Sequence, residues 1–321
     1  MSKKCIGCGA VLQNTDKNKN GYTPKLENKY CMRCFRIANY GDFTATRPEK
    51  DNEKIISIVN SAEEYCFFLV DATNISREVI AIYDSIKTRK CLLLTKIDLL
   101  PLNIKVNNYL KNFKNIYHIK EEVYPLSSLK KVNVNKILKI MDDLSLKKAY
   151  VLGCTNAGKS TLINAMLNNP TITTSRVPNT TLDFINLYIE DKTLTDTPGF
   201  SLKETPFTTD KKYLKKLDYK ERIKPITYQT KETTNIVIEN TYRLANFGLN
   251  SITTYFNNNI EVKRDFKSAD EYFEVKIMAN TDIVIKDLGF INVKRPCNLR
   301  MSKNLEELVE FRPSLIGGQD E

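Results

Sequence analysis

The segment Gly153–Ser160 has the residue types and spacing of a phosphate-binding loop. It reads Gly-Cys-Thr-Asn-Ala-Gly-Lys-Ser, which fits G-x-x-x-x-G-K-[ST], and it lies between the apolar run 149–152 and a helical pattern. In such a loop backbone N–H groups surround the phosphates, the lysine reaches the β- and γ-phosphates, and the serine hydroxyl can bind Mg²⁺. We therefore expect nucleotide contacts from Gly153, Asn156, Ala157, Gly158, Lys159, Ser160 and Thr161, with Ser160 on the magnesium ion.

A second motif, Asp196-Thr197-Pro198-Gly199, follows a short strand pattern at 193–195. A carboxylate at the carboxyl end of a sheet strand can hold the magnesium shell, and Gly199 can offer a backbone N–H to the γ-phosphate. The polar loop 178–183 lies between the two motifs, and a threonine there can complete the magnesium sphere. Both Thr180 and Thr181 fit that role.

The choice of base is predicted by Thr95-Lys96-Ile97-Asp98, which follows the apolar run 91–94. The Asp98 carboxylate can accept two hydrogen bonds from guanine, whereas adenine would leave it without partners. The Lys96 stem can cover the ring face. A downstream loop, Tyr124–Ser128, would complete the base site. Across the whole base site, nucleotide contacts are expected from Thr95, Lys96, Asp98, Ser127 and Ser128.

Two C-x-x-C pairs near the N-terminus suggest a metal site. The two pairs are separated from each other by 22 residues. Four thiolates at such spacing favour tetrahedral Zn²⁺ with a structural role. Reactive or simply buried thiols are the alternative. The expected zinc ligands are Cys5, Cys8, Cys31 and Cys34.

The composition limits the class of protein. The chain has 321 residues and a net charge of +11, which favours polyanionic partners, nucleic acid first, although a basic surface can also serve solubility alone. Apolar runs such as 66–70 are far shorter than the roughly 20 residues of a membrane helix. No apolar secretion signal follows Met1. We expect a cytoplasmic monomer that contacts no membrane.

Alternating apolar strands and amphipathic helices predict an α/β fold with a mainly parallel sheet. Strands are expected at 65–70, 91–95, 122–127, 149–152, 184–190 and 193–195, and helices at 76–87, 133–144 and 159–168. The basic stretch 203–224 reads as a linker or an exposed helix. Beyond it we expect a small α+β domain with strands near 235–239 and 282–285 and a helix near 268–277.

The motifs resemble those of the YqeH family of ribosome-assembly GTPases across nearly the whole chain. The segments that carry the resemblance are 5–36, like a treble-clef zinc finger, the nucleotide motifs in the order G4, G5, G1, G2, G3, and 282–291 and 311–316 near the end. The resemblance implies a zinc finger at 1–48, a circularly permuted P-loop GTPase domain at 52–204, and a basic linker with an RNA- or ribosome-binding domain at 205–321. It also implies GTP hydrolysis during maturation of the small ribosomal subunit, with rRNA as partner, and favours Thr181 as the magnesium ligand.

The residue after the second motif, Phe200, stands where many GTPases carry a water-orienting glutamine. Combined with Asn156, it resembles GTPases in which K⁺ supplies positive charge in the transition state. The expected catalytic residues are therefore Lys159, Asn156, Thr181 and Gly199. Two alternatives remain: a zinc-containing RNA-binding module that uses GTP as a ligand with little hydrolysis, and a permuted GTPase that acts on the large subunit or on tRNA.

Overall fold

The computed structural model describes residues 3, 5, 11–16, 21–32, 52–167, 172–176, 184–219, 221–267 and 271–316, with only the backbone of 172–176. The chain forms two compact units, Met1–Lys50 and Asp51–Glu321. Within the described part of the first unit, Cys5, Leu12 and Cys31 form a small buried cluster, and Gln13 pairs with Tyr22 in a β-bridge.

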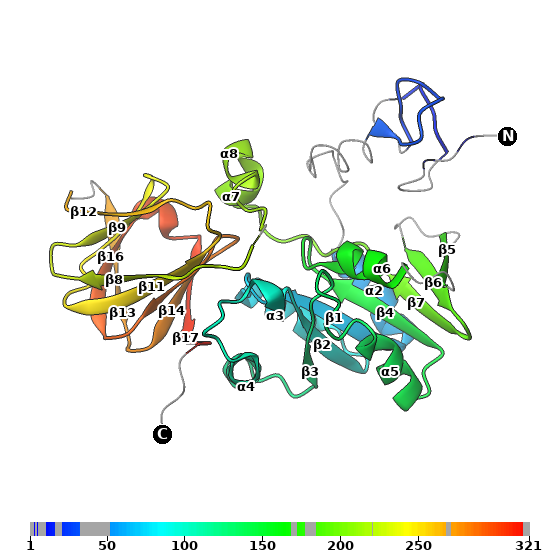
Figure 1. The fold of residues 1–321 in the computed structure, drawn as a ribbon, viewed down its shortest axis with the longest axis horizontal. Helices are drawn as coiled ribbons and strands as arrows, with labels where there is room; N and C mark the ends of the chain where they lie inside the picture. The colour runs from blue at the N-terminus through cyan, green and yellow to red at the C-terminus, as the bar shows by residue number, and fades with distance from the viewer. Residues whose placement is uncertain are drawn as a thin grey trace. The chain divides into compact units, whose positions relative to one another are not determined.

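A seven-stranded sheet forms the first half of the larger unit (Figure 1). Its order is β3-β2-β1-β4-β7-β6-β5; neighbours from β3 to β7 run parallel, and β6 and β5 add an antiparallel edge. The strands are β1 (Tyr65–Asp71), β2 (Lys90–Thr95), β3 (Val123–Pro125), β4 (Lys148–Gly153), β5 (Ile172–Arg176), β6 (Ile185–Ile189) and β7 (Lys192–Asp196). The parallel α/β architecture is confirmed, and all six expected strands are present.

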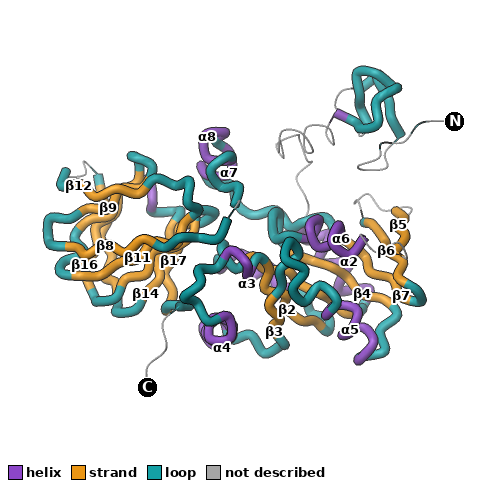
Figure 2. The backbone as a smooth tube through the Cα atoms, in the orientation of Figure 1, coloured by secondary structure: helices purple, strands orange, loops and turns teal. Residues whose placement is uncertain are grey.

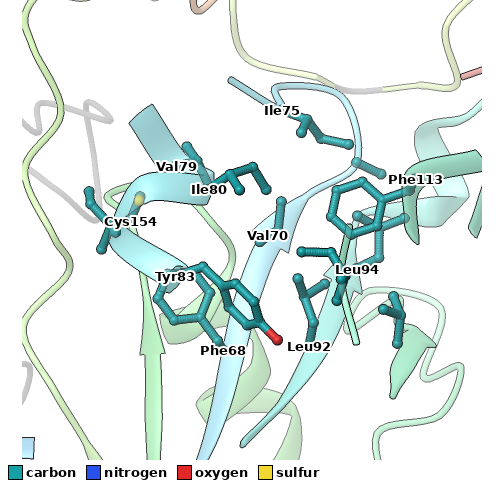
Figure 3. Packing of buried hydrophobic residues seen from close by; sticks show 14 of the residues in the cluster. Phe68, Val70, Ile75, Val79, Ile80, Tyr83, Leu92, Leu94, Phe113 and Cys154 are labelled. Carbon is teal, nitrogen blue, oxygen red and sulfur yellow. The ribbon is translucent and has the colours of Figure 1, made fainter. Parts of the chain in front are cut away.

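The central strands are apolar throughout because helices cover both faces of the sheet. Along β1, Phe68 and Val70 face one core, while Phe67 and Leu69 face the other. The first core includes residues of α2 (Asn52–Ala62), α3 (Arg77–Ser85) and α4 (Val106–Tyr117), and the second includes residues of α5 (Lys136–Asp143) and α6 (Lys159–Leu167). Figure 3 shows Val79, Ile80 and Tyr83 of α3 packed over Phe68 and Val70.

The strand order shows the circular permutation. β4 ends at Gly153 and lies beside β1, although β2 and β3 precede it in the chain. The guanine box, Thr95–Asp98, follows β2, and the phosphate loop follows β4. Because β1 lies between these two strands and all three run parallel, both motifs leave the same edge of the sheet. A circular permutation of this kind keeps the contacts within the sheet and moves only the positions of the chain ends.

Strands are the main regular secondary structure of residues 205–316 (Figure 2). Two five-stranded antiparallel sheets, β12-β9-β10-β16-β13 and β17-β14-β15-β11-β8, enclose an apolar core that also takes Phe207 and Tyr213. The elements are α7 (Pro206–Thr209), α8 (Lys211–Leu214), β8 (Ile226–Thr230), β9 (Asn235–Ile238), β10 (Tyr242–Ala245), β11 (Asn250–Phe256), β12 (Val262–Asp265), β13 (Tyr272–Ile277), β14 (Thr281–Ile285), β15 (Gly289–Val293), β16 (Cys297–Ser302), the 3₁₀ turn η2 (Lys303–Leu305) and β17 (Val309–Pro313).

The helix expected near 268–277 is wrong. Residues 272–277 form β13, which pairs with β16 along its whole length. Its side chains alternate between more exposed and more buried, ending at the buried Ile277, which is the period of a strand. The helices described in 205–316 are instead the short α7 and α8 and the turn η2, within the part of the chain that the structure covers.

The second half of this unit packs directly on the first. Tyr255, Val284, Phe290 and Leu315 belong to the same core as α3 and α4. Arg312, 7% exposed, donates from Nη1 to the Ile75 carbonyl at 3.0 Å and lies 3.4 Å from the Asp282 carboxylate. Burial raises the pKa of Asp282 in spite of this guanidinium. The two halves therefore share apolar and polar buried contacts.

Candidate nucleotide-binding site

The phosphate loop connects β4 to α6 in a conformation that requires glycine. Gly153 has φ +153°, and a Cβ there would lie 2.8 Å from the Leu69 carbonyl oxygen; Gly158 has φ +94°. Asn156 also has positive φ, at 65°, which asparagine tolerates better than most residues. Lys159, 8% exposed, donates from Nζ to the Gly153 carbonyl at 3.0 Å. The lysine thus folds back over its own loop.

The Asp196–Gly199 motif lies against this loop. A Cβ on Gly199 would come within 2.9 Å of Lys159 Nζ and 3.2 Å of the Thr155 nitrogen. The next residue, Phe200, donates its N–H to Gly153 O at 3.1 Å and accepts from Thr155 N–H at 2.9 Å. Asp196 ends β7 and pairs in register with Val151 of β4. The structure therefore brings the two expected phosphate-side motifs together.

The Phe200 side chain faces the core. It is fully buried, and its ring stacks on Phe68 with centroids 6.0 Å apart. The neighbouring Cys154 is also buried, and burial raises the pKa of its thiol to about 12, so it stays protonated at neutral pH. Figure 3 shows Cys154 among apolar side chains of α3. Neither residue offers a polar group toward a phosphate.

The guanine box is attached to the phosphate loop by Thr95. This residue is 2% exposed, and its hydroxyl donates to the Ala157 carbonyl at 2.8 Å, with Val70 O farther away at 3.2 Å. Lys96 follows with φ 57°, and Asp98 lies in the 3₁₀ turn η1 (Ile97–Leu99). The Thr95 hydroxyl therefore links the guanine box to a carbonyl of the phosphate loop.

Main-chain hydrogen bonds join the second base loop, Tyr124–Ser128, to the guanine box and its strand. Leu126 N–H donates to Leu94 O at 2.8 Å, and Ile97 N–H donates to Leu126 O at 3.3 Å. Ser127 is fully buried and its hydroxyl accepts from Lys130 N–H at 3.1 Å, which fixes the turn; Ser128 is half-buried. The structure thus brings together the expected base-side loops.

Two features of the site were not anticipated from the sequence. Asp71, at the end of β1, lies 2.6 Å from Lys96 Nζ. The end of the basic stretch 203–224 crosses the guanine box, where Arg222 Nε donates to Asp98 O at 3.1 Å and Ile223 N–H donates to Leu99 O at 2.9 Å. Asp71 could have been found from the sequence, because it is an acidic residue that ends a buried strand at the binding edge of the sheet. Nothing in the local sequence indicated that the end of the basic stretch 203–224 contacts the guanine box.

Several expected ligands lie outside the described residues: Cys8, Cys34, Thr180 and Thr181. No cluster of three or more metal-ligating side chains occurs among the residues that the structure does describe. One half of the zinc pattern is visible, because Cys5 and Cys31 are each 2% exposed and Cys31 N–H donates to Cys5 Sγ at 3.1 Å. The structure therefore brings two of the four expected zinc ligands together in one buried cluster.

Comparison with known proteins identifies the family. YqeH of Bacillus subtilis is 31% identical over 246 residues, which cover 70% of this chain and 67% of that protein. The chain belongs to the YqeH family. A family model described as 50S ribosome-binding GTPase matches residues 148–254, from β4 through the phosphate loop and Gly199. That match omits the guanine box, which in this permuted order comes earlier in the chain.

More distant similarities cover smaller parts of the chain. GTPase Der of Buchnera aphidicola is 34% identical over 147 residues, covering 43% of this chain and 27% of Der. A crystal structure of YjeQ from Thermotoga maritima aligns with 16% identity and a TM-score of 0.32, over 48% of this chain and 55% of that one. This YqeH homologue is accordingly a GTPase that uses GTP, GDP and Mg²⁺. Its described helices include none of the length and apolarity that a bilayer would require.

Proposed function

We propose that this YqeH-family GTPase hydrolyses GTP while it assists assembly of the small ribosomal subunit. The observation that carries the proposal is the meeting of the phosphate loop, the Asp196–Gly199 motif and the guanine box at one edge of the permuted sheet. The Thr95–Ala157 and Phe200–Gly153 hydrogen bonds connect these three parts. Such a site can bind a guanine nucleotide before any further partner arrives.

On the phosphate side, five residues would act on the nucleotide or on its magnesium ion. Lys159 would place its ammonium on the β- and γ-phosphates, and Gly199 would donate a backbone N–H near the γ-phosphate. Ser160 and Asp196 would hold Mg²⁺, which neutralises charge on the transferring phosphoryl group when bound. Thr181 is the proposed third protein contact of that ion. In the structure, the closeness of Gly199 to Lys159 supports this division of roles.

On the base side, Asp98 would accept hydrogen bonds from guanine and Lys96 would cover its ring. Thr95 would set their position, because its hydroxyl is bonded to the phosphate loop. Ser127 and Ser128 would supply the second loop. An adenine ring would leave the Asp98 carboxylate without its two donors, which is a strong basis for discrimination.

Hydrolysis is proposed to depend on K⁺. With Phe200 buried against Phe68, the usual place of a water-orienting glutamine holds a core residue. Asn156, exposed on the phosphate loop, offers an amide oxygen that could help hold a monovalent cation. When bound, such a cation would supply positive charge to the transition state. Little hydrolysis even in K⁺ would favour the binding-module alternative.

The proposed ribosomal partner follows from charge and family. A net charge of +11 suits contact with rRNA, and a zinc ion held by Cys5, Cys8, Cys31 and Cys34 would stabilise a segment with a small apolar cluster. We assign the domains as a zinc finger at 1–48, the GTPase domain at 52–204 and an RNA- or ribosome-binding region at 205–321. We further propose that the protein acts as a cytoplasmic monomer.

The description of the matching family model as a 50S ribosome-binding GTPase favours a second candidate, a role on the large subunit. Sedimentation of the full chain with purified small and large subunits, in GDP and in a non-hydrolysable GTP analogue, distinguishes them. We expect co-sedimentation with the small subunit, stronger with the GTP analogue. Single-turnover hydrolysis with each subunit should show stimulation by the small one. Binding and stimulation by the large subunit alone would replace the proposal by its alternative.

A further inference from the structure

An ion pair joins the ends of the two strands beside the base site. β1 ends at Asp71 and β2 at Thr95, and these two residues are partners in the parallel register. Lys96, the next residue, therefore leaves the sheet beside Asp71, and its Nζ lies 2.6 Å from Asp71 Oδ2. The side chains are 29% exposed for Lys96 and 13% exposed for Asp71. The carboxylate is thus the less exposed partner of the pair.

The Asp71 carboxylate is held by its own turn. Its Oδ1 accepts from the Thr73 N–H at 2.8 Å and from the Thr73 hydroxyl at 2.7 Å. Oδ2 is directed to the lysine, so one oxygen fixes the group and the other receives the ammonium. An acceptor that is already ordered loses little freedom when it binds a charged donor.

The same turn is tied to the second half of the unit. Asn74 Nδ2 donates to Asp287 Oδ1 at 3.1 Å, and Asp287 N–H donates to Asn74 Oδ1 at 3.2 Å. One residue farther, Ile75 O accepts from the buried Arg312. The carboxylate that meets Lys96 is therefore anchored from the C-terminal region as well as from its own strand.

We propose that Asp71 is a positioning residue of the guanine site, holding the Lys96 ammonium so that the lysine stem lies across the base. A free lysine stem samples many rotamers, and ordering it on nucleotide binding costs entropy. A fixed carboxylate reduces that cost in advance. The proposal rests on the assignment of Lys96 to the base site, and it adds a residue whose effect on nucleotide affinity passes through Lys96.

A double-mutant cycle tests the pairing with fluorescent GDP on the full chain. Asp71→Asn keeps an oxygen that Thr73 can donate to, so it removes the charge while preserving the turn. We expect Lys96→Met to weaken GDP binding roughly tenfold and Asp71→Asn roughly three- to tenfold, mainly through faster dissociation. In the Lys96→Met background, Asp71→Asn should change affinity less than twofold. The exposed Asp84→Asn on α3 is the matched control and should behave as wild type.

Two further measurements distinguish a positioning role of Asp71 from a general structural role. The single-turnover rate at saturating GTP should stay within twofold of wild type in Asp71→Asn, because the loss concerns binding and not the phosphate chemistry. Should Asp71→Asn fold poorly, Thr73→Val can be used instead, because it loosens the Asp71 carboxylate while both charges remain. We expect Thr73→Val to cause a smaller loss of GDP affinity, and that loss should also disappear in the Lys96→Met background.

Equal losses from Asp71→Asn with and without Lys96 would overturn the proposal and give the carboxylate a purely structural role. Unchanged GDP affinity in Asp71→Asn would overturn it as well, while leaving the guanine box intact. Unchanged affinity in Lys96→Met would overturn both this pairing and the assignment of Lys96 to the base site, so the two failures are distinguishable.

Discussion

Replacing Thr95 by valine removes a hydroxyl that joins the guanine box to the phosphate loop. The two side chains have nearly the same shape, so the change deletes the 2.8 Å bond to Ala157 O with little change in packing. Both residues are buried, at 2% and 4% exposure, so water cannot readily replace the lost donor. Leaving a buried acceptor without its partner costs about 1–3 kcal/mol.

That cost should divide between folding and nucleotide binding. A loss of about 1–2 kcal/mol in the bound form corresponds to roughly five- to thirtyfold weaker GDP binding. If about 1 kcal/mol appears in the free protein, the Tm should fall by about 2–4 °C, the scale for a unit of this size. Thr95→Ser keeps the hydroxyl and should lose less than threefold in affinity.

The assay is titration of fluorescent GDP together with thermal unfolding of the same samples. Thr227→Val provides the control, because Thr227 is exposed and its hydroxyl meets Thr253 on β11, away from the phosphate loop. We expect it to change neither reading. GDP affinity within twofold of wild type in Thr95→Val, or equal losses in the valine and serine variants, would refute the claim that this hydroxyl couples the two loops.

Three other outcomes are expected. Cys31→Ser, or a strong chelator, should release about one zinc per chain, measured by metal analysis, and weaken subunit binding while GDP affinity changes less than twofold; a metal-free protein that binds subunits normally would contradict this. Single-turnover hydrolysis should be roughly tenfold or more faster in K⁺ than in Na⁺, and Asn156→Ala should lose that difference; equal rates in both salts for wild type would count against the cation. Gly199→Ala, whose Cβ would lie 2.9 Å from Lys159 Nζ and 3.2 Å from Thr155 N, should slow hydrolysis roughly tenfold or more while GDP still binds; an unchanged single-turnover rate would remove Gly199 from the phosphate site.

Much of the sheet could be predicted because its strands carry strong local patterns. Runs such as 66–70 and 91–94 are apolar on both faces, which is typical of parallel strands covered on both sides, and the glycine pattern at 153–158 encodes a backbone conformation. The phosphate-side and base-side motifs were found for the same reason. Their chemistry depends on residue types at fixed local spacing.

Other features depended on distant contacts. The helix α4 was missed because its exposed face is rich in asparagine, a weak helix former, while its stability comes from Tyr109 and Phe113 in the core. The sequence predicted only a linker or an exposed helix, the basic stretch 203–224, between the GTPase domain and the C-terminal domain. The structure adds a direct interface, in which Arg312 meets a carbonyl 237 residues away, and no local pattern encodes such a contact.

The most direct measurement of the central claim is equilibrium binding of guanosine, adenosine and xanthosine diphosphates to the full chain and to its Asp98→Asn variant. The permuted site predicts that wild type prefers GDP to ADP by roughly a hundredfold or more, because adenine cannot supply the two donors that Asp98 accepts. The variant should bind GDP much more weakly and prefer the xanthosine nucleotide, whose ring has a carbonyl in place of the guanine amine. Wild type that binds ADP as tightly as GDP, or a variant with unchanged preference, would contradict the account.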